Sequence, residues 1–262
     1  MSKWDIYDEL IEGIPADLHV LDCAVGSVWT YVKTEDTCGV CLTVRQKAGK
    51  ELLNGRITGM NLRDAAALSK SWNFIEASMG MAAINSWYNR VEHIREMGIL
   101  PGEGERRTKD VFELFGPQIK GKKVTVVGHF PHIEKTLAPV CDLTILERDP
   151  SEGDLPDSAC EYILGEQDLV IITGMTFTNK TLPRLLELCR PDSFVSVAGP
   201  SVPMCEGLLK RGITHLSGYC VSDAENVMEV IKLGKKRDIF DFGYKLDCTA
   251  GCSFPGPSFG VH

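Results

Sequence analysis

The segment from residue 173 to residue 181 is dense in side chains that can bind a polar ligand. It reads Thr-Gly-Met-Thr-Phe-Thr-Asn-Lys-Thr and carries four hydroxyls, one amide and one ammonium. A helix cap would use Asn179 or Thr181 to bond the free amides at the start of the next helix. One cap explains one residue. We therefore expect the segment also to contact a ligand, through Thr173, Gly174, Thr176, Asn179 and Thr181.

A second short segment, Gly199-Pro200-Ser201, combines rigidity with a hydroxyl. Gly199 permits a tight turn, and Pro200 fixes the backbone that presents Ser201. Rigid loops make preorganised sites, which favours a ligand contact here. A stiff turn without a ligand explains the same residues equally well.

The run Gly128-His129-Phe130-Pro131-His132 follows a predicted strand, where a dinucleotide-binding sheet has its glycine fingerprint. That fingerprint would need glycine at positions 128, 130 and 133, and only Gly128 is present. Phe130 would keep a pyrophosphate away from the backbone, so conventional NAD(P) binding is not expected. The turn could still receive an anion or a small polar group. A plain surface loop explains it as well.

Glu147 ends the next predicted strand, where a dinucleotide-binding sheet has the acid that bonds a ribose hydroxyl. With His129 and His132, it forms a set of nitrogen and oxygen ligands. Such a set suits zinc, nickel or cobalt better than calcium. These three residues are the candidate metal ligands, should a transition or heavy metal bind.

Two cysteine pairs have ligand-like spacing, Cys38 with Cys41 and Cys248 with Cys252. A closed zinc site needs four ligands held together. Each pair supplies two, and the pairs lie at opposite ends of the chain. We therefore expect cysteines that pack as small, reduced core residues, and the role of both pairs stays open.

The N-terminal part of the chain predicts a helix, a small antiparallel meander and then more helices. Strands are expected over residues 18–25, 29–33 and 40–44, with a turn at residues 35–39. Helices are expected over 63–68 and 74–88. The second shows an apolar stripe on which Asn85 falls, so this amide is bonded to neighbouring backbone or faces a site.

The C-terminal part alternates strands with helices, which predicts an α/β fold with a doubly wound, Rossmann-like parallel sheet. Ligands bind such sheets at the carboxyl ends of the strands. Residues 98–107 suggest a linker and 108–115 a short helix. The predicted domains are residues 1–97, a connection over 98–120, and residues 121–262. The strands are expected over 124–127, 143–147, 169–173, 194–197 and 215–218, and the helices over 133–137, 159–164, 182–189, 205–211 and 223–233.

The chain has 262 residues and a formal net charge of −8. A nucleic-acid partner needs a basic face, so none is expected. The N-terminus lacks the apolar core of a signal peptide, and no apolar run is long enough for a membrane span. These features predict a cytoplasmic protein with mostly reduced cysteines.

Four segments resemble the motifs of the heavy-metal chelation family. They are Gly26-Ser27-Val28-Trp29-Thr30, Gly80-Met81-Ala82-Ala83-Ile84-Asn85-Ser86, the segment 173–181 and Gly199-Pro200-Ser201. The resemblance covers nearly the whole chain. It implies a small α+β domain like the N-terminal domain of enolase, followed by a Rossmann-like domain. It also implies a ligand site in the cleft between them, to which Trp29 and Asn85 would contribute, but it supplies no reaction.

Three functions stay open. The first is binding of a small polar ligand, a heavy metal or a metal chelate in the cleft. The second is an enzyme that acts on a small metabolite with a nucleotide-type cofactor, in which His129 or His132 is the acid–base group. The third is a regulatory or scaffold protein with a vestigial site. The oligomeric state is also open, with a homodimer among the options.

Overall fold

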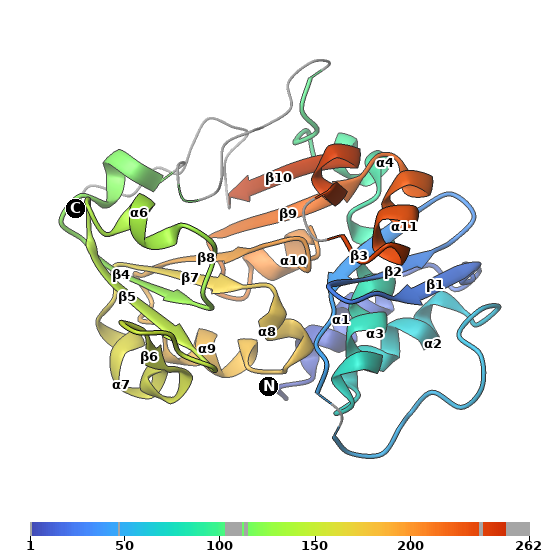
Figure 1. Cartoon of the computed structure of the whole chain (residues 1–262), viewed down its shortest axis with the longest axis horizontal. Coiled ribbons are helices and arrows are strands. Elements are labelled where there is room, and N and C mark those ends of the chain that lie inside the picture. Colours follow the sequence, from blue (N-terminus) through green and yellow to red (C-terminus); the bar gives the residue numbers. More distant parts are fainter. Residues whose placement is uncertain (1, 47, 103–111, 113–114, 236–237, 250–262) are drawn as a thin grey trace.

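The computed structural model describes residues 2–46, 48–102, 112, 115–235 and 238–249, and its chain forms two β-sheets with helices around them (Figure 1). The smaller sheet is an antiparallel meander of β1 (Asp22–Val25), β2 (Trp29–Lys33) and β3 (Cys38–Leu42). The predicted meander is confirmed. The expected turn was too long, because Cys38 and Gly39 already pair with Lys33 and Val32 in the ladder.

Four α-helices accompany this sheet, namely α1 (Asp5–Glu12), α2 (Leu62–Ala67), α3 (Phe74–Tyr88) and α4 (Val91–Glu96). Helix α3 begins at Asn73, whose side chain accepts a hydrogen bond from the amide of Ile75. The expected single apolar stripe was too narrow, since α3 is buried on almost every side. Small residues make this possible. A Cβ on Gly39 would collide with the α3 backbone at Ser86.

The larger sheet has seven strands in the order β10-β9-β8-β7-β4-β5-β6. Every neighbouring pair is parallel except β9 with β10. Counted along the chain, the six parallel strands follow the order 3-2-1-4-5-6 found in doubly wound dinucleotide-binding sheets. The sequence predicted a sheet with parallel strands throughout. This prediction is wrong only at one edge, where β10 pairs antiparallel with β9. The strands are β4 (Lys123–Val127), β5 (Asp142–Glu147), β6 (Leu155–Pro156), β7 (Leu169–Thr173), β8 (Phe194–Ala198), β9 (His215–Val221) and β10 (Gly243–Thr249).

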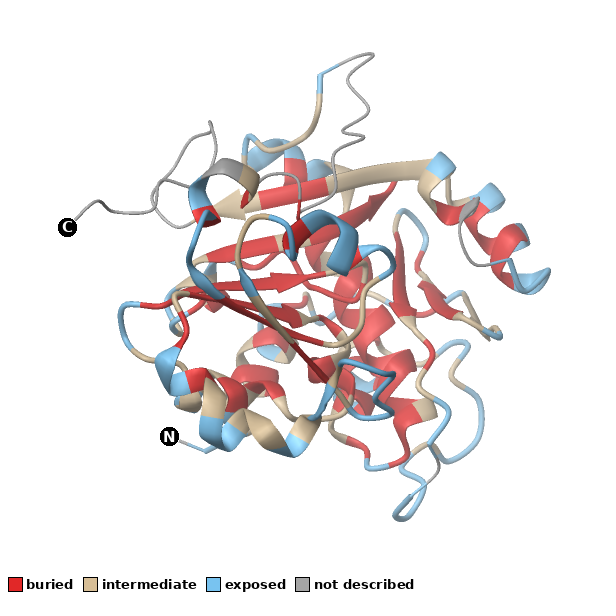
Figure 2. Ribbon diagram, turned by 60° about the vertical axis from the view of Figure 1, so that its left-hand side comes forward, coloured by how far each residue is buried: buried red, intermediate tan, exposed pale blue. Residues whose placement is uncertain are grey.

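Strands β4, β7, β8 and β9 in the middle of this sheet are buried almost throughout, as Figure 2 shows in red. Ile171 of β7 packs with Ile133 of α6 on one face, whereas its neighbours Val170 and Ile172 pack with Leu185 of α9 on the other. This accounts for the continuous apolar runs in the sequence. The helices after β4 are α6 (Ile133–Leu137), α7 (Cys160–Ile163), α8 (Met175–Thr178), α9 (Leu182–Leu188), α10 (Glu206–Leu209) and α11 (Ala224–Lys232).

One hydrophobic cluster runs through both parts of the chain, from Leu10 and Ile84 to Val197 and Leu246. The division into separate domains therefore stays a prediction. Residues 103–107 of the expected linker and most of the short helix expected at 108–115 lie outside the described residues. No helix in the described ranges has the length and apolar character to cross a membrane.

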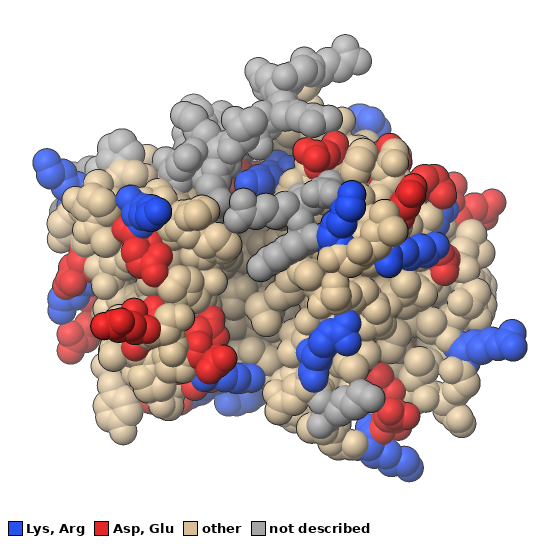
Figure 3. All heavy atoms as spheres, viewed as in Figure 1, with Lys and Arg blue, Asp and Glu red and all other residues tan. Residues whose placement is uncertain are grey.

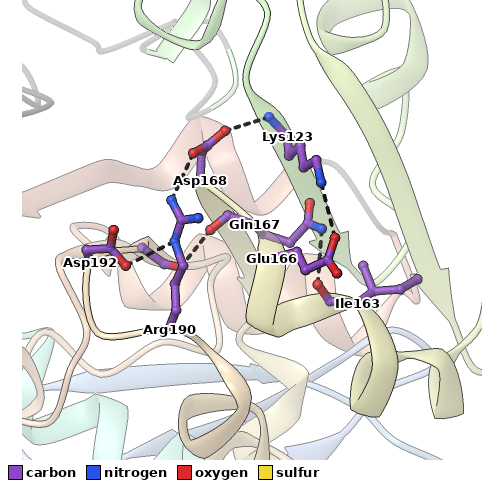
Figure 4. Close-up of polar contacts among 8 residues, drawn as sticks. Lys123, Ile163, Glu166, Gln167, Asp168, Arg190 and Asp192 are labelled. Carbon is purple, nitrogen blue, oxygen red and sulfur yellow. Dashed lines mark hydrogen bonds and ion pairs between the residues drawn. The ribbon is translucent and has the colours of Figure 1, made fainter.

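The amino ends of the strands are held by a polar network (Figure 4). Asp168 accepts hydrogen bonds from the backbone of Lys123 at 2.9 Å and from Arg190 at 2.9 Å. The Lys123 ammonium pairs with Glu166, and Arg190 also pairs with Asp192. These charges fix the amino ends of β4 and β7. Ligands bind such sheets at the opposite edge, beyond the carboxyl ends of the strands.

Candidate functional site

A cavity of about 830 Å³ lies at the carboxyl ends of β4, β5, β7 and β8. Trp29, Leu42 and Val44 of the smaller sheet and its continuation close it from the other side. The molecule is hollowed between these two parts, and charges of both signs are interspersed on the same face (Figure 3). Every predicted ligand-binding residue except Asn85 lines the cavity, namely Trp29, Gly128, His129, Phe130, Pro131, Glu147, Thr173, Gly174, Thr176, Asn179, Thr181, Gly199, Pro200 and Ser201. That they bind a ligand stays a prediction.

Two glycines let the chain turn sharply where it leaves the sheet. Gly128 after β4 has φ +103° and Gly199 after β8 has φ +120°, in the region that disfavours other residues. A Cβ on Gly128 would also lie 2.8 Å from Thr173 Cγ2. The loops after β4 and β7 can therefore meet at one wall of the cavity.

The turn after β8 is docked on the smaller sheet. Ser201 Oγ accepts a hydrogen bond from the Leu42 amide at 2.9 Å. The Asn85 amide donates to the carbonyls of Val40 at 2.8 Å and Pro200 at 3.4 Å. Asn85 is fully buried, and its Oδ1 has no hydrogen-bond partner within the described ranges. Asn85 thus lies behind the cavity wall and braces it.

Asn89, one helical turn further on, is a docking residue that the sequence analysis missed. Its Nδ2 donates to the carbonyls of Val202 at 2.9 Å and Tyr219 at 3.0 Å, and its Oδ1 accepts from the Met204 amide at 2.8 Å. The amide is therefore fully satisfied between the two parts of the chain. The one sequence signal was a polar residue at the end of an apolar helix.

The hydroxyls of segment 173–181 are used largely within the protein. Thr176 Oγ1 donates to the Thr173 carbonyl at 2.7 Å, and Thr181 Oγ1 donates to Asn179 Oδ1 at 2.6 Å. Thr178 Oγ1 contacts Cys41 Sγ at 3.5 Å. The argument that capping leaves most of these side chains unexplained was wrong, because local bonds occupy them. Thr181 is at the N-cap of α9 but makes no side-chain cap bond.

His129 is the centre of a charged group. Its Nδ1 lies 2.9 Å from Asp154 Oδ2 and its Nε2 lies 3.1 Å from Glu134 Oε1. Asp154 is 2% exposed and also accepts from the Ser151 amide at 3.0 Å. The hydrogen bond that His129 donates to the Asp154 carboxylate raises the pKa of His129 above its usual value. An imidazole held by a carboxylate on one nitrogen is the usual arrangement of a histidine that binds metal through the other.

The predicted metal ligands are only partly brought together. In the described ranges, the one group of three candidate ligands within 4.8 Å of one another is His129, Glu134 and Asp154. Glu147 instead accepts from the backbone amides of His129 at 2.7 Å and Arg148 at 2.6 Å. It therefore holds the loop after β4. The exposed His132 is outside the group. A role for either residue in metal binding stays a prediction.

Cys38 and Cys41 face opposite sides of β3. Cys38 packs with Trp29 and Tyr31, whereas Cys41 belongs to the main core and contacts Ser201 Oγ at 3.5 Å. Two strand residues three apart cannot hold one ion together. The described cysteines are free thiols, as expected, and Cys252 lies outside the described residues.

Two family models match most of the chain. Residues 110–247 match the model of the DUF364 family, described as "Putative heavy-metal chelation". The chain belongs to the DUF364 family. Residues 7–88 match DUF4213, which carries the same description.

Two solved structures share the fold of this DUF364 protein. A DUF364-family protein from Desulfitobacterium hafniense DCB-2 is 39% identical, with a TM-score of 0.87 over 94% of this chain and 98% of that one. A Pyrococcus horikoshii protein of the family is 23% identical, with a TM-score of 0.78 over 95% and 100%, and supports the fold alone. An uncharacterised protein of Methanocaldococcus jannaschii is 26% identical over 86% of this chain and 87% of its own length.

Proposed function

We propose that the protein binds a divalent transition-metal ion at the wall of the cavity, with His129 as the central ligand. The observation that carries the proposal is the group of His129, Glu134 and Asp154 beside a cavity of about 830 Å³. An imidazole and a carboxylate as ligands, with a second carboxylate that orients the ring, suit zinc, nickel or cobalt better than softer ions that require thiolates. The family description supports the same class of ligand.

The two carboxylates have different roles in this proposal. Asp154 is buried and is fixed by the Ser151 amide, so it accepts the Nδ1 proton and orients the ring. Nε2 lies 3.1 Å from Oε1 of Glu134, whose side chain is half-exposed, so an ion bound between these two atoms would replace this contact. Two protein ligands leave coordination positions for water or for a second molecule in the cavity.

The test is calorimetric titration of the metal-free full-length chain with zinc, nickel and cobalt chlorides. His129→Ala should lower affinity at least tenfold, because it removes the central ligand. His19→Ala is the matched control, an exposed histidine outside both the cavity lining and the group of candidate ligands. It should bind like the wild type. Loss of binding in Cys38→Ala but not in His129→Ala would refute the proposal.

A second candidate is an enzyme that uses a nucleotide-type cofactor. It is favoured by the 3-2-1-4-5-6 strand order and by Glu147, which lines the cavity at the position of a ribose-binding acid. Glu147 already accepts two backbone hydrogen bonds, but each carboxylate oxygen can accept another. Adenosine binding that disappears in Glu147→Gln but not in the exposed Glu152→Gln would support this candidate over the first.

A further inference from the structure

We infer that the metal is bound as a complex with a small, planar aromatic chelator rather than as a hydrated ion. This inference rests on the proposed metal function and names the class of molecule that fills the remainder of the cavity. It is drawn from the size of the cavity, from the chemistry of its walls and from the pairing of its charged residues.

The cavity is much larger than a hydrated ion requires. Six waters around an ion occupy roughly 180 Å³ at about 30 Å³ per water. The cavity measures about 830 Å³, which lies within the range that accommodates drug-sized organic ligands. A hydrated ion at His129 would leave most of this space to disordered water.

Part of the cavity wall is apolar and aromatic. Trp29 meets the cavity from β2, and its ring packs edge-to-face on Phe240, with centroids 6.3 Å apart. Phe130 lines the opposite side, supported by Phe112 at 5.0 Å. Leu42 extends this surface. Water against such walls is unfavourable, whereas an aromatic ring gains both apolar burial and ring contacts.

The two arginines that line the cavity, Arg148 and Arg184, are already paired within the protein, and the lining also carries four carboxylates, on Glu147, Asp149, Asp157 and Glu161. Arg148 lies 3.0 Å from Asp157, and Arg184 pairs with both Glu161 and Glu187. A strongly anionic ligand would be repelled by the excess of carboxylates over guanidinium groups in this lining. A neutral chelator with ring-nitrogen donors would not, and its metal could complete its coordination at His129.

The experiment compares three probes by calorimetry on the full chain, namely nickel chloride, 1,10-phenanthroline, and their equimolar complex. The complex should bind about tenfold or more tightly than nickel alone, because its rings bury apolar surface. Val44→Trp places an indole in the cavity wall formed by Trp29, Leu42 and Val44. It should abolish this gain and leave binding of nickel alone unchanged. Val44→Leu is the conservative control and should keep the gain.

The outcomes separate this inference from the proposed function. If nickel binds through His129 but phenanthroline adds no affinity, or if Val44→Trp keeps the whole gain, the inference fails and metal binding stands. If nickel binds in neither form, metal binding fails and the inference fails with it. Thermal unfolding of each variant checks that the loss of binding is not a loss of fold.

Discussion

The hydroxyl of Ser201 accepts a hydrogen bond from the backbone amide of Leu42 at 2.9 Å and so joins the turn after β8 to β3. Both residues line the cavity, and Ser201 is 3% exposed. The bond therefore holds together two walls that come from distant parts of the sequence. Its energy contributes to stability and, by fixing the separation of these walls, to the shape of the cavity.

Ser201→Ala should lower the free energy of unfolding by about 1–2 kcal/mol. It removes the acceptor of the Leu42 amide, which is half-buried, and leaving such a donor unsatisfied costs about this much. Urea denaturation measures the change. The control is Ser86→Ala, also buried, whose hydroxyl donates to the Ala83 carbonyl within α3. If Ser86→Ala lowers the free energy of unfolding as much as Ser201→Ala does, the Ser201–Leu42 bond contributes no more to stability than a bond within one helix.

The sequence predicts a helix or strand well where the pattern of its apolar residues is unambiguous. The strand at residues 169–173 and the helix at 133–137 are found at the predicted residues. An apolar run between polar turns identifies a strand buried on both faces. Strand β10 was missed because a strand at the edge of a sheet is half-buried and has a weaker pattern. It also pairs antiparallel, which strand–helix alternation does not predict.

The site is predicted to the extent that topology determines it. A parallel sheet brings its strand ends to one edge, so the loops after β4, β7 and β8 were found from their positions alone. Asp154, Glu134 and Asn89 were missed. Each contributes through a contact between side chains or loops whose relative positions the sequence pattern does not fix.

NAD and NADP should bind only weakly, with dissociation constants above about 1 mM (about −4 kcal/mol). Phe130 and Ile133 occupy positions where glycine would let a pyrophosphate approach the backbone, and Phe130 is held by Phe112 at 5.0 Å. Calorimetric titration measures the affinity. A micromolar constant for either nucleotide would contradict this prediction.

The nine thiols in the described part of the chain should react slowly with Ellman's reagent in the native protein, and all ten cysteines should react after denaturation. Burial raises the pKa of Cys38 and of Cys220 to about 12, so little thiolate exists at neutral pH. Cys160 differs, because it lines the cavity. In a Cys252→Ser background, a bound aromatic chelator should slow the labelling of Cys160 without changing that of Cys141. Equal protection of both thiols would indicate a global effect rather than occupancy of the cavity.

Lys180 makes the stability of the protein depend on pH. Burial lowers the pKa of its ammonium to about 7, although the charged form lies 5.0 Å from the Phe74 ring and donates to the Thr178 carbonyl at 2.7 Å. Between pH 7 and the usual lysine pKa near 10.4, the unfolded chain therefore holds a proton that the folded chain has released. The free energy of unfolding must rise with pH across this window.

Lys180→Met should consequently be more stable than the wild type near pH 7, by on the order of 1–2 kcal/mol, and this advantage should shrink as pH rises towards 10. The pKa shift of Lys180 alone would give a larger difference in the free energy of unfolding, but solvent reaches part of the ammonium and screens its charge. Lys180 has φ +65°, a strain that methionine shares, so the backbone term cancels in the comparison. Urea denaturation between pH 7 and 10 measures the difference, with the exposed Lys122→Met as the control for the loss of one positive charge. A stability difference between Lys180→Met and the wild type that does not change with pH would show that the amine stays fully charged in the folded protein, through its contacts with Phe74 and Thr178.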